Sequence, residues 1–86
     1  MNHAVRFTRE SEHDMAHIAK ADQQLCKRII RKLESLQTRP LQGKPLVGSH
    51  AGERSLRVGA YRIVYEVWEE KNQIIILTVK HRRHVY

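Results

Sequence analysis

The sequence is poor in the features that mark secreted and membrane proteins. Cys26 is the single cysteine among 86 residues, so the chain can form no internal disulfide. A lone thiol within an apolar helical pattern is expected to behave as a small hydrophobe and is consistent with a reducing compartment. No apolar run approaches the roughly 20 residues that a membrane-spanning helix needs, and the polar start MNHAVRFTRE has no signal-peptide pattern. The sequence therefore predicts a cytoplasmic protein without a membrane partner.

Acidic residues are also scarce. Nine Asp and Glu stand against sixteen Lys and Arg, which gives a formal charge of +7, and ten of the sixteen are arginines. The planar fork of arginine suits phosphate best among cationic side chains. Such a balance predicts a polyanionic partner, either nucleic acid or an acidic protein, although a basic surface that serves solubility alone would show the same charge.

Proline and glycine are few and clustered, which divides the chain into elements. Both prolines and three of the four glycines fall within 38–53, so this stretch is expected to be a loop, with a short strand or turn at 46–47. Residues 3–8 favour a strand, and Thr8 to Ser11 can cap a helix. A second helix is predicted from the apolar repeat of Leu25, Ile29, Leu33 and Leu36.

The last third of the chain predicts strands at 54–58, 61–68 and 74–82, rich in β-branched and aromatic residues. The expected fold is a single α+β domain over residues 1–86. It has an N-terminal strand, an antiparallel helical hairpin, and then three or more antiparallel strands in a twisted sheet with the helices on one face.

Alternation of side chains across each strand assigns the two faces of that sheet. The predicted core face carries the apolar set Leu56, Val58, Tyr61, Ile63, Tyr65, Val67, Ile75, Leu77 and Val79. The open face then carries the cations Arg57, Arg62, Lys80 and Arg82. Several cations on one face are an arrangement that binds phosphates, but an uncovered sheet face must be polar in any case.

Six histidines raise the question of a metal site. His13 and His17 are four residues apart on the first predicted helix, a spacing that can bind zinc. No cysteine pair or acidic ligand accompanies them, so we interpret them as surface residues and predict no metal.

Three segments together resemble the RelE/ParE toxin superfamily. They are PLQGKPLVG at 40–48, RSLRVGAYRIVY at 54–65 and VKHRRHVY at 79–86, and the likeness covers almost the whole chain. The resemblance, closest to the RelE type, implies the toxin of a type II toxin–antitoxin system. It implies a ribosome-dependent endoribonuclease that cleaves mRNA in the A site without a metal or other cofactor. It also implies a small, acidic antitoxin as partner, in a hetero-oligomer.

The resemblance assigns roles to individual residues. Arg62 matches an arginine that stabilises charge on the scissile phosphate, and Arg82 one that contacts phosphate and can protonate the leaving oxygen. Tyr86 matches a C-terminal tyrosine that orients the base. Arg57 matches a basic position on the strand that carries the family's catalytic lysines. Lys80, Arg54 and Arg83 are further predicted phosphate ligands.

The general base is left open by one departure from the family pattern. Some members place two lysines just before the position of Arg57, whereas this chain has Glu53, Arg54 and Ser55. Glu53, His81 and His84 are candidates, and so is Arg57 acting only electrostatically. Histidine suits the task because its pKa lies near neutrality. Alternation puts His81 on the core side, which favours His84.

The expected reaction is attack of a ribose 2′-hydroxyl on the adjacent phosphate, which requires RNA. Two alternatives remain at this point. A ParE-like toxin would share the fold but inhibit DNA gyrase without cleaving RNA. A basic RNA-binding module would bind RNA with steep salt dependence and leave it intact.

Overall fold

The computed structural model describes residues 2–84, and for His84 the main chain only. It contains two helices, α1 (Arg9–Ala21) and α2 (Gln23–Ser35). The strands are β1 (Ala4–Phe7), β2 (Lys44–Pro45), β3 (Arg54–Val58), β4 (Tyr61–Trp68) and β5 (Gln73–His81). Three short 3-10 turns are η1 (Gly48–His50), η2 (Glu69–Lys71) and η3 (Arg82–His84). Strand, two helices and a C-terminal set of strands follow one another as predicted.

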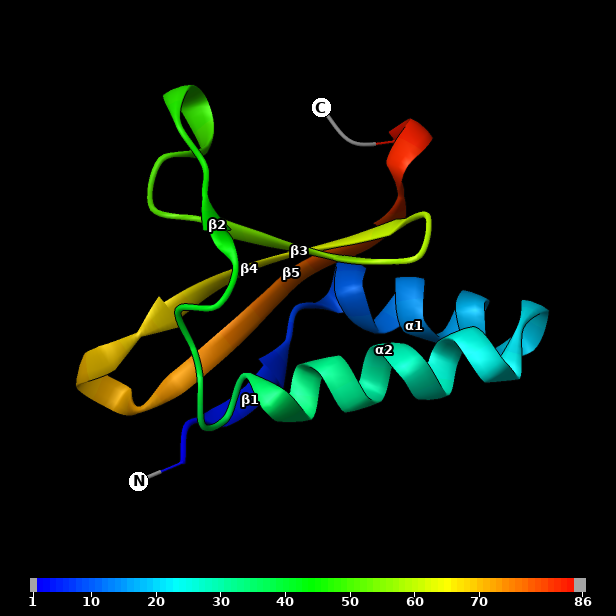
Figure 1. Cartoon of the computed structure of the whole chain (residues 1–86), viewed down its shortest axis with the longest axis horizontal. Coiled ribbons are helices and arrows are strands. Elements are labelled where there is room, and N and C mark those ends of the chain that lie inside the picture. The colour runs from blue at the N-terminus through cyan, green and yellow to red at the C-terminus, as the bar shows by residue number, and fades with distance from the viewer. Residues whose placement is uncertain (1, 85–86) are drawn as a thin grey trace.

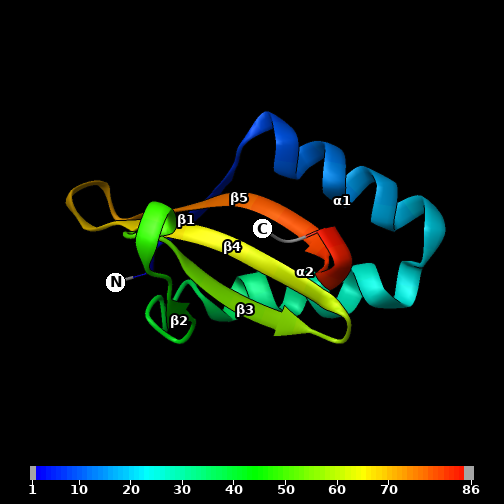
Figure 2. The same cartoon turned by 90° about the horizontal axis from the view of Figure 1, so that it is seen from above.

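The strands form one five-stranded sheet in the order β1-β5-β4-β3-β2. The C-terminal strands pair antiparallel, whereas β1 runs parallel to β5, so the sheet is mixed. Both helices lie along one side of it (Figure 1). On the other side, the hairpin that carries η1 and the turn η3 rise at opposite ends of the sheet (Figures 1 and 2). They leave an open face between them.

Side-chain caps set the ends of the helices. The Thr8 hydroxyl accepts a hydrogen bond from the main-chain N–H of Ser11 and so caps α1. Asp22 alone separates the helices: its N–H donates to the Ile18 carbonyl at the end of α1, and its carboxylate accepts from the Leu25 N–H at the start of α2. One residue therefore both ends one helix and starts the next, which holds the helical hairpin tight.

The core lies between the sheet and the two helices, and it shows one error in the predicted faces. Ile74 and Ile76 are fully buried in it, where Ile75 and Leu77 were predicted. The cause is a β-bulge. Tyr65 of β4 pairs with Ile76 but Val64 pairs with Thr78, so Leu77 is an extra residue in β5. An extra residue reverses the alternation, and the prediction is therefore correct only beyond the bulge, at Val79.

The long loop also differs from its prediction. The short strand is Lys44–Pro45, which pairs with the start of β3, and not 46–47. Tyr65 anchors this loop from inside the core: its hydroxyl donates to the Pro40 carbonyl at 2.8 Å and accepts from the Gly43 N–H at 2.9 Å. Burial raises the pKa of Tyr65, so the phenol stays protonated and keeps this donor.

Candidate functional site

Three cations lie side by side across the open face. Arg57 of β3 is paired in register with Arg62 of β4, and Arg62 with Lys80 of β5. Because neighbouring strands are about 4.8 Å apart, the three Cα positions span about 10 Å. The predicted sharing of one face by these residues is confirmed. Like charges directly opposite one another destabilise a sheet, so the Arg57–Arg62 pair lowers stability unless an anion joins it.

Arg62 is the central residue of the row, and its side chain is incompletely satisfied. It is half-buried near the start of β4, and its Nε is buried without a hydrogen-bond partner. Within residues 2–84, no carboxylate forms an ion pair with Arg62 or Arg57. A buried guanidinium N–H without an acceptor is costly, and an anion bound at the row would supply one.

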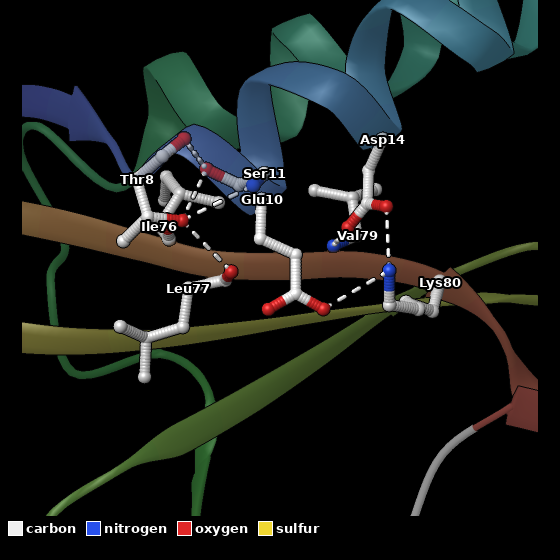
Figure 3. Close-up of polar contacts among 8 residues, drawn as sticks. All are labelled: Thr8, Glu10, Ser11, Asp14, Ile76, Leu77, Val79 and Lys80. Carbon is white, nitrogen blue, oxygen red and sulfur yellow. Dashed lines mark hydrogen bonds and ion pairs between the residues drawn. The ribbon is translucent and has the colours of Figure 1, made fainter.

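Lys80 differs from the two arginines because its charge is already compensated. Its Nζ lies 2.6 Å from Asp14 Oδ1 and 3.2 Å from Glu10 Oε2, both on α1 (Figure 3). The hydrogen bond that the Lys80 amine donates to Asp14 is the main cause of a raised pKa for Lys80. The amine therefore stays charged and is held toward α1, which makes it a poor general base and a weaker phosphate ligand than the arginines.

Asp14 also binds the main chain of β5. Its Oδ2 accepts from the Val79 N–H at 2.9 Å, and its side chain is only 9% exposed. At the N-cap of α1, the Thr8 hydroxyl donates to the Leu77 carbonyl at 3.0 Å, and the Thr8 N–H donates to the Ile76 carbonyl at 3.1 Å (Figure 3). The start of α1 is thus attached to β5 at the bulge, and it fixes the strand that carries Lys80.

The predicted C-terminal site residues follow β5 in a turn. Arg82 was predicted as the last strand residue, but β5 ends at His81 and Arg82 begins η3. Its N–H donates to the Ala60 carbonyl at 2.8 Å, which places the turn beside the β3–β4 connection. Arg82 and Arg83 are both exposed. These two cations therefore lie near the end of β4 at which Arg62 stands.

His81 lies on the core side of the sheet, as predicted. Its ring meets the Tyr61 ring edge-on, with centroids 5.4 Å apart. Its Nδ1 accepts a hydrogen bond from the Arg83 N–H at 3.2 Å. This ring supports the turn η3 and does not face the cation row, which removes His81 as a candidate base.

Two predicted residues lie away from the row. Arg54 shares the face of the core residue Tyr65, and its guanidinium donates to the Leu41 and Gly43 carbonyls at 3.3 and 2.8 Å. We therefore remove Arg54 from the predicted phosphate ligands. Glu53 lies 3.1 Å from His50 Nδ1, and four residues of extended strand separate it from Arg57 by about 13 Å. It is too distant to act as the base there.

Two predicted catalytic groups lie outside the described part of the chain. These are the whole of Tyr86 and the side chain of His84. The absence of a metal site stays a prediction. Among residues 2–84, no three His, Cys, Asp or Glu side chains are grouped so that they could hold an ion. His13 and His17 instead line a hollow of about 530 Å³ together with Asp14, Tyr61, Lys80 and His81.

Comparison with known proteins identifies the family. The sequence model of a protein family, the ParE toxin of type II toxin–antitoxin systems, matches residues 5–86. The protein belongs to this toxin family. The toxin is 33% identical over 88 residues to Toxin RelG of Mycobacterium tuberculosis (strain ATCC 25618 / H37Rv), an alignment that covers 100% of this chain and 98% of the relative.

Solved structures of RelE- and YoeB/ParE-type toxins share the fold of this toxin. A chain in the crystal structure of the toxin–antitoxin complex RelBE2 from Mycobacterium tuberculosis is 32% identical, with a TM-score of 0.84 over 95% of this toxin and 93% of that chain. The YoeB/ParE toxin from Agrobacterium tumefaciens has a TM-score of 0.83 over 91% of this toxin and 96% of its own chain, at 22% identity, which shows a shared fold.

The toxin also carries features that sequence reasoning missed. Glu10 and Asp14 were not predicted as part of the site, although their spacing of four residues puts both on one face of α1. An apolar hollow of about 500 Å³ lies between β1 and the helices, lined mainly by Val5, Phe7, Met15, Ile30 and Leu33. Neither described helix is long and apolar enough to cross a bilayer.

Proposed function

We propose that this toxin is a ribosome-dependent endoribonuclease that cleaves mRNA in the A site. The observation that carries the proposal is the row of Arg57, Arg62 and Lys80, in which the buried Nε of Arg62 has no protein partner. A phosphodiester is an anion of the size and charge that this row would accept, and the guanidinium fork can bind two of its oxygens. The +7 charge of the chain would assist association with RNA.

The reaction would be an internal transesterification. A base removes the proton of a ribose 2′-hydroxyl, and the 2′ oxygen attacks the neighbouring phosphorus. The P–O5′ bond breaks, the 5′ oxygen takes a proton, and a 2′,3′-cyclic phosphate and a 5′-hydroxyl remain. Arg62 would stabilise the extra negative charge of the phosphorane, with Arg57 beside it.

Residues near the C-terminus complete this proposal. Arg82, and Arg83 next to it, would contact the phosphate or the leaving oxygen. His84 would act as the base, and Tyr86 would orient the substrate base by stacking. Lys80 would contribute a fixed charge at the border of the row, since Asp14 and Glu10 hold its amine.

A cell-free translation assay tests the reaction. Wild-type toxin added to a translating extract should produce cuts within codons that are mapped by primer extension, with 5′-hydroxyl ends that a polynucleotide kinase can label. Arg62→Ala should lower the cleavage rate by about 10²–10³ fold, and Arg62→Lys should not restore it, because lysine lacks the fork. Arg6→Ala removes an exposed arginine of β1 and should cut like wild type. An Arg62→Ala variant that cuts normally refutes the assignment.

A second candidate function has one observation in its favour. The matching family model is that of ParE toxins, and the alternative is therefore a gyrase inhibitor without nuclease activity. A supercoiling assay with purified gyrase separates the two. Inhibition of supercoiling by wild-type toxin, together with intact messages in the translation assay, would establish the second function.

An antitoxin partner forms part of the proposal. The chain in the RelBE2 structure, 32% identical to this toxin, is described in a toxin–antitoxin complex. The apolar hollow beside β1 is a surface suited to an amphipathic segment of such a partner, because it combines apolar side chains with Glu12 and Glu34 at its border. Co-expression with an acidic protein encoded beside the toxin should give a stable complex and abolish RNA cleavage.

A further inference from the structure

We infer that the arginine-rich side of α2 forms a second phosphate-binding surface, which holds RNA backbone beyond the cleavage site. This inference rests on the proposed ribonuclease function and extends its substrate contacts. The surface is a hollow of about 380 Å³ on the helix side of β3. Five cations line it: Arg28, Arg31, Lys32, Arg39 and Arg57. The other lining residues are Ser35, Val58 and Gly59, so no carboxylate takes part.

Helix geometry gathers three of these cations on one side of α2. Residues three and four apart on a helix are neighbours, which puts Arg28 beside Arg31 and Lys32 on α2. Like charges at this spacing destabilise a helix by a few tenths of a kcal/mol each. Across residues 2–84, no ion pair involves any of the five side chains. The repulsion is therefore uncompensated in the free chain, and a bound polyanion would relieve it.

Arg57 connects this hollow with the row on the open face. Strand β2 pairs only with Arg54 and Ser55, so the backbone of β3 at Arg57 has no strand on its outer side. Arg57 is paired in register with Arg62 and also lines the α2 hollow. The Arg28 guanidinium lies against the β3–β4 turn, with Nη1 3.7 Å from the position of a Cβ on Gly59. Cations thus continue from the row around the edge of β3 onto α2.

The composition of the hollow favours nucleic-acid backbone over an acidic protein. Val58 is its single apolar side chain, and it is already buried in the core. Protein interfaces depend on buried apolar or aromatic anchors, which this surface lacks. Four of the five cations are arginines, whose guanidinium groups bind phosphate oxygens in pairs. The chemistry recognised is a series of phosphodiesters without base specificity.

The test is the salt dependence of RNA binding in an Arg62→Ala background, so that the RNA is bound but not cut. The probe is a fluorescein-labelled 20-nucleotide uridine RNA, measured by anisotropy at several KCl concentrations. The triple variant R28Q/R31Q/R39Q is compared with R6Q/K20Q/K71Q, which removes the same charge from exposed cations outside the hollow. Loss of three phosphate contacts should reduce the slope of log K against log [KCl] by about 2, and the control should keep its slope.

Three results would overturn the inference. Equal slopes for the two triple variants would show that net charge alone matters, and an unchanged slope in the α2 variant would show that the hollow does not contact RNA. Tighter binding of a 20-residue polyglutamate peptide than of the RNA, lost in the α2 variant alone, would assign the surface to an acidic protein. Failure of the proposed function is distinguishable, because it appears as absence of cleavage by wild type while the difference in slope persists.

Discussion

Replacement of Asp14 by alanine tests the attachment of α1 to β5. The Asp14 carboxylate accepts from the Val79 N–H at 2.9 Å and from Lys80 Nζ at 2.6 Å, and Val79 is 2% exposed. In the alanine variant the Val79 N–H loses its acceptor in a buried position. Lys80 keeps Glu10 and its contact with solvent, since the Lys80 side chain is 31% exposed.

The magnitude follows from these two losses. A buried donor left without a partner costs about 1–3 kcal/mol, and loss of a partly exposed ion pair adds at most about 1 kcal/mol. We expect Asp14→Ala to lower the free energy of unfolding by about 2–3 kcal/mol. For a domain of this size, that corresponds to a fall in Tm of about 10–20 °C. Asp14→Asn retains an oxygen acceptor for Val79 and should cost about 1 kcal/mol.

Urea unfolding followed by circular dichroism measures the effect, with the same slope m expected for each variant. Glu10→Gln is the matched control: Glu10 contacts the same amine but is 61% exposed, so its loss should cost no more than about 0.5 kcal/mol. An Asp14→Ala variant that unfolds within about 0.5 kcal/mol of wild type, or an Asp14→Asn variant as destabilised as Asp14→Ala, would refute this role of the Asp14 carboxylate.

Three further predictions concern the loop anchor and alkaline pH. Tyr65→Phe removes the bonds to Pro40 and Gly43 and should lower the free energy of unfolding by about 1–2 kcal/mol in the same urea assay; a neutral result would contradict the role of the hydroxyl. Gly43→Ala puts a Cβ 2.7 Å from Tyr65 Oη and 2.8 Å from the Ser55 carbonyl, and should cost about 1–3 kcal/mol by the same measurement. The folded-state pKa values of Tyr65 and Lys80 are raised above their ordinary values of 10.0 and 10.5. The contribution of each group to the free energy of unfolding is therefore present below about pH 10 and is lost as the pH rises through the raised pKa. Unfolding measured from pH 8 to 11 should show this loss, and Asp14→Ala should reduce it.

The apolar spacing of the sequence predicted the elements well because each rests on local chemistry. Leu25, Ile29 and Leu33 fall on one side of α2, and Thr8 caps α1 as its side chain suggested. Alternation correctly placed Arg57 and Arg62 on the open face, because β3 and β4 pair without interruption. The row of cations could therefore be predicted before any coordinates.

Other features depend on tertiary contacts that leave little trace in the pattern. The run of four apolar residues at 74–77 fits either face of a strand, so the extra residue Leu77 in the bulge was not detectable. Asp14 looks like any polar residue of a surface helix until β5 lies beside it. Arg54 is different, because alternation along β3 already puts it on the core face with Leu56 and Val58. The sequence pattern itself therefore argued against Arg54 as a phosphate ligand.

The position of β1 has a consequence for how the toxin is made. Ala4 pairs with Gln73 and Phe7 with Ile76, so the first strand has its sheet partner almost a full chain length away. A growing polypeptide cannot complete this sheet until residues 73–76 have been synthesised, because contacts between distant segments must await the later one. An unfinished chain that stops before 73 has neither the strand that bears Lys80 nor a partner for β1. The five-stranded sheet can therefore form only after β5 has been synthesised.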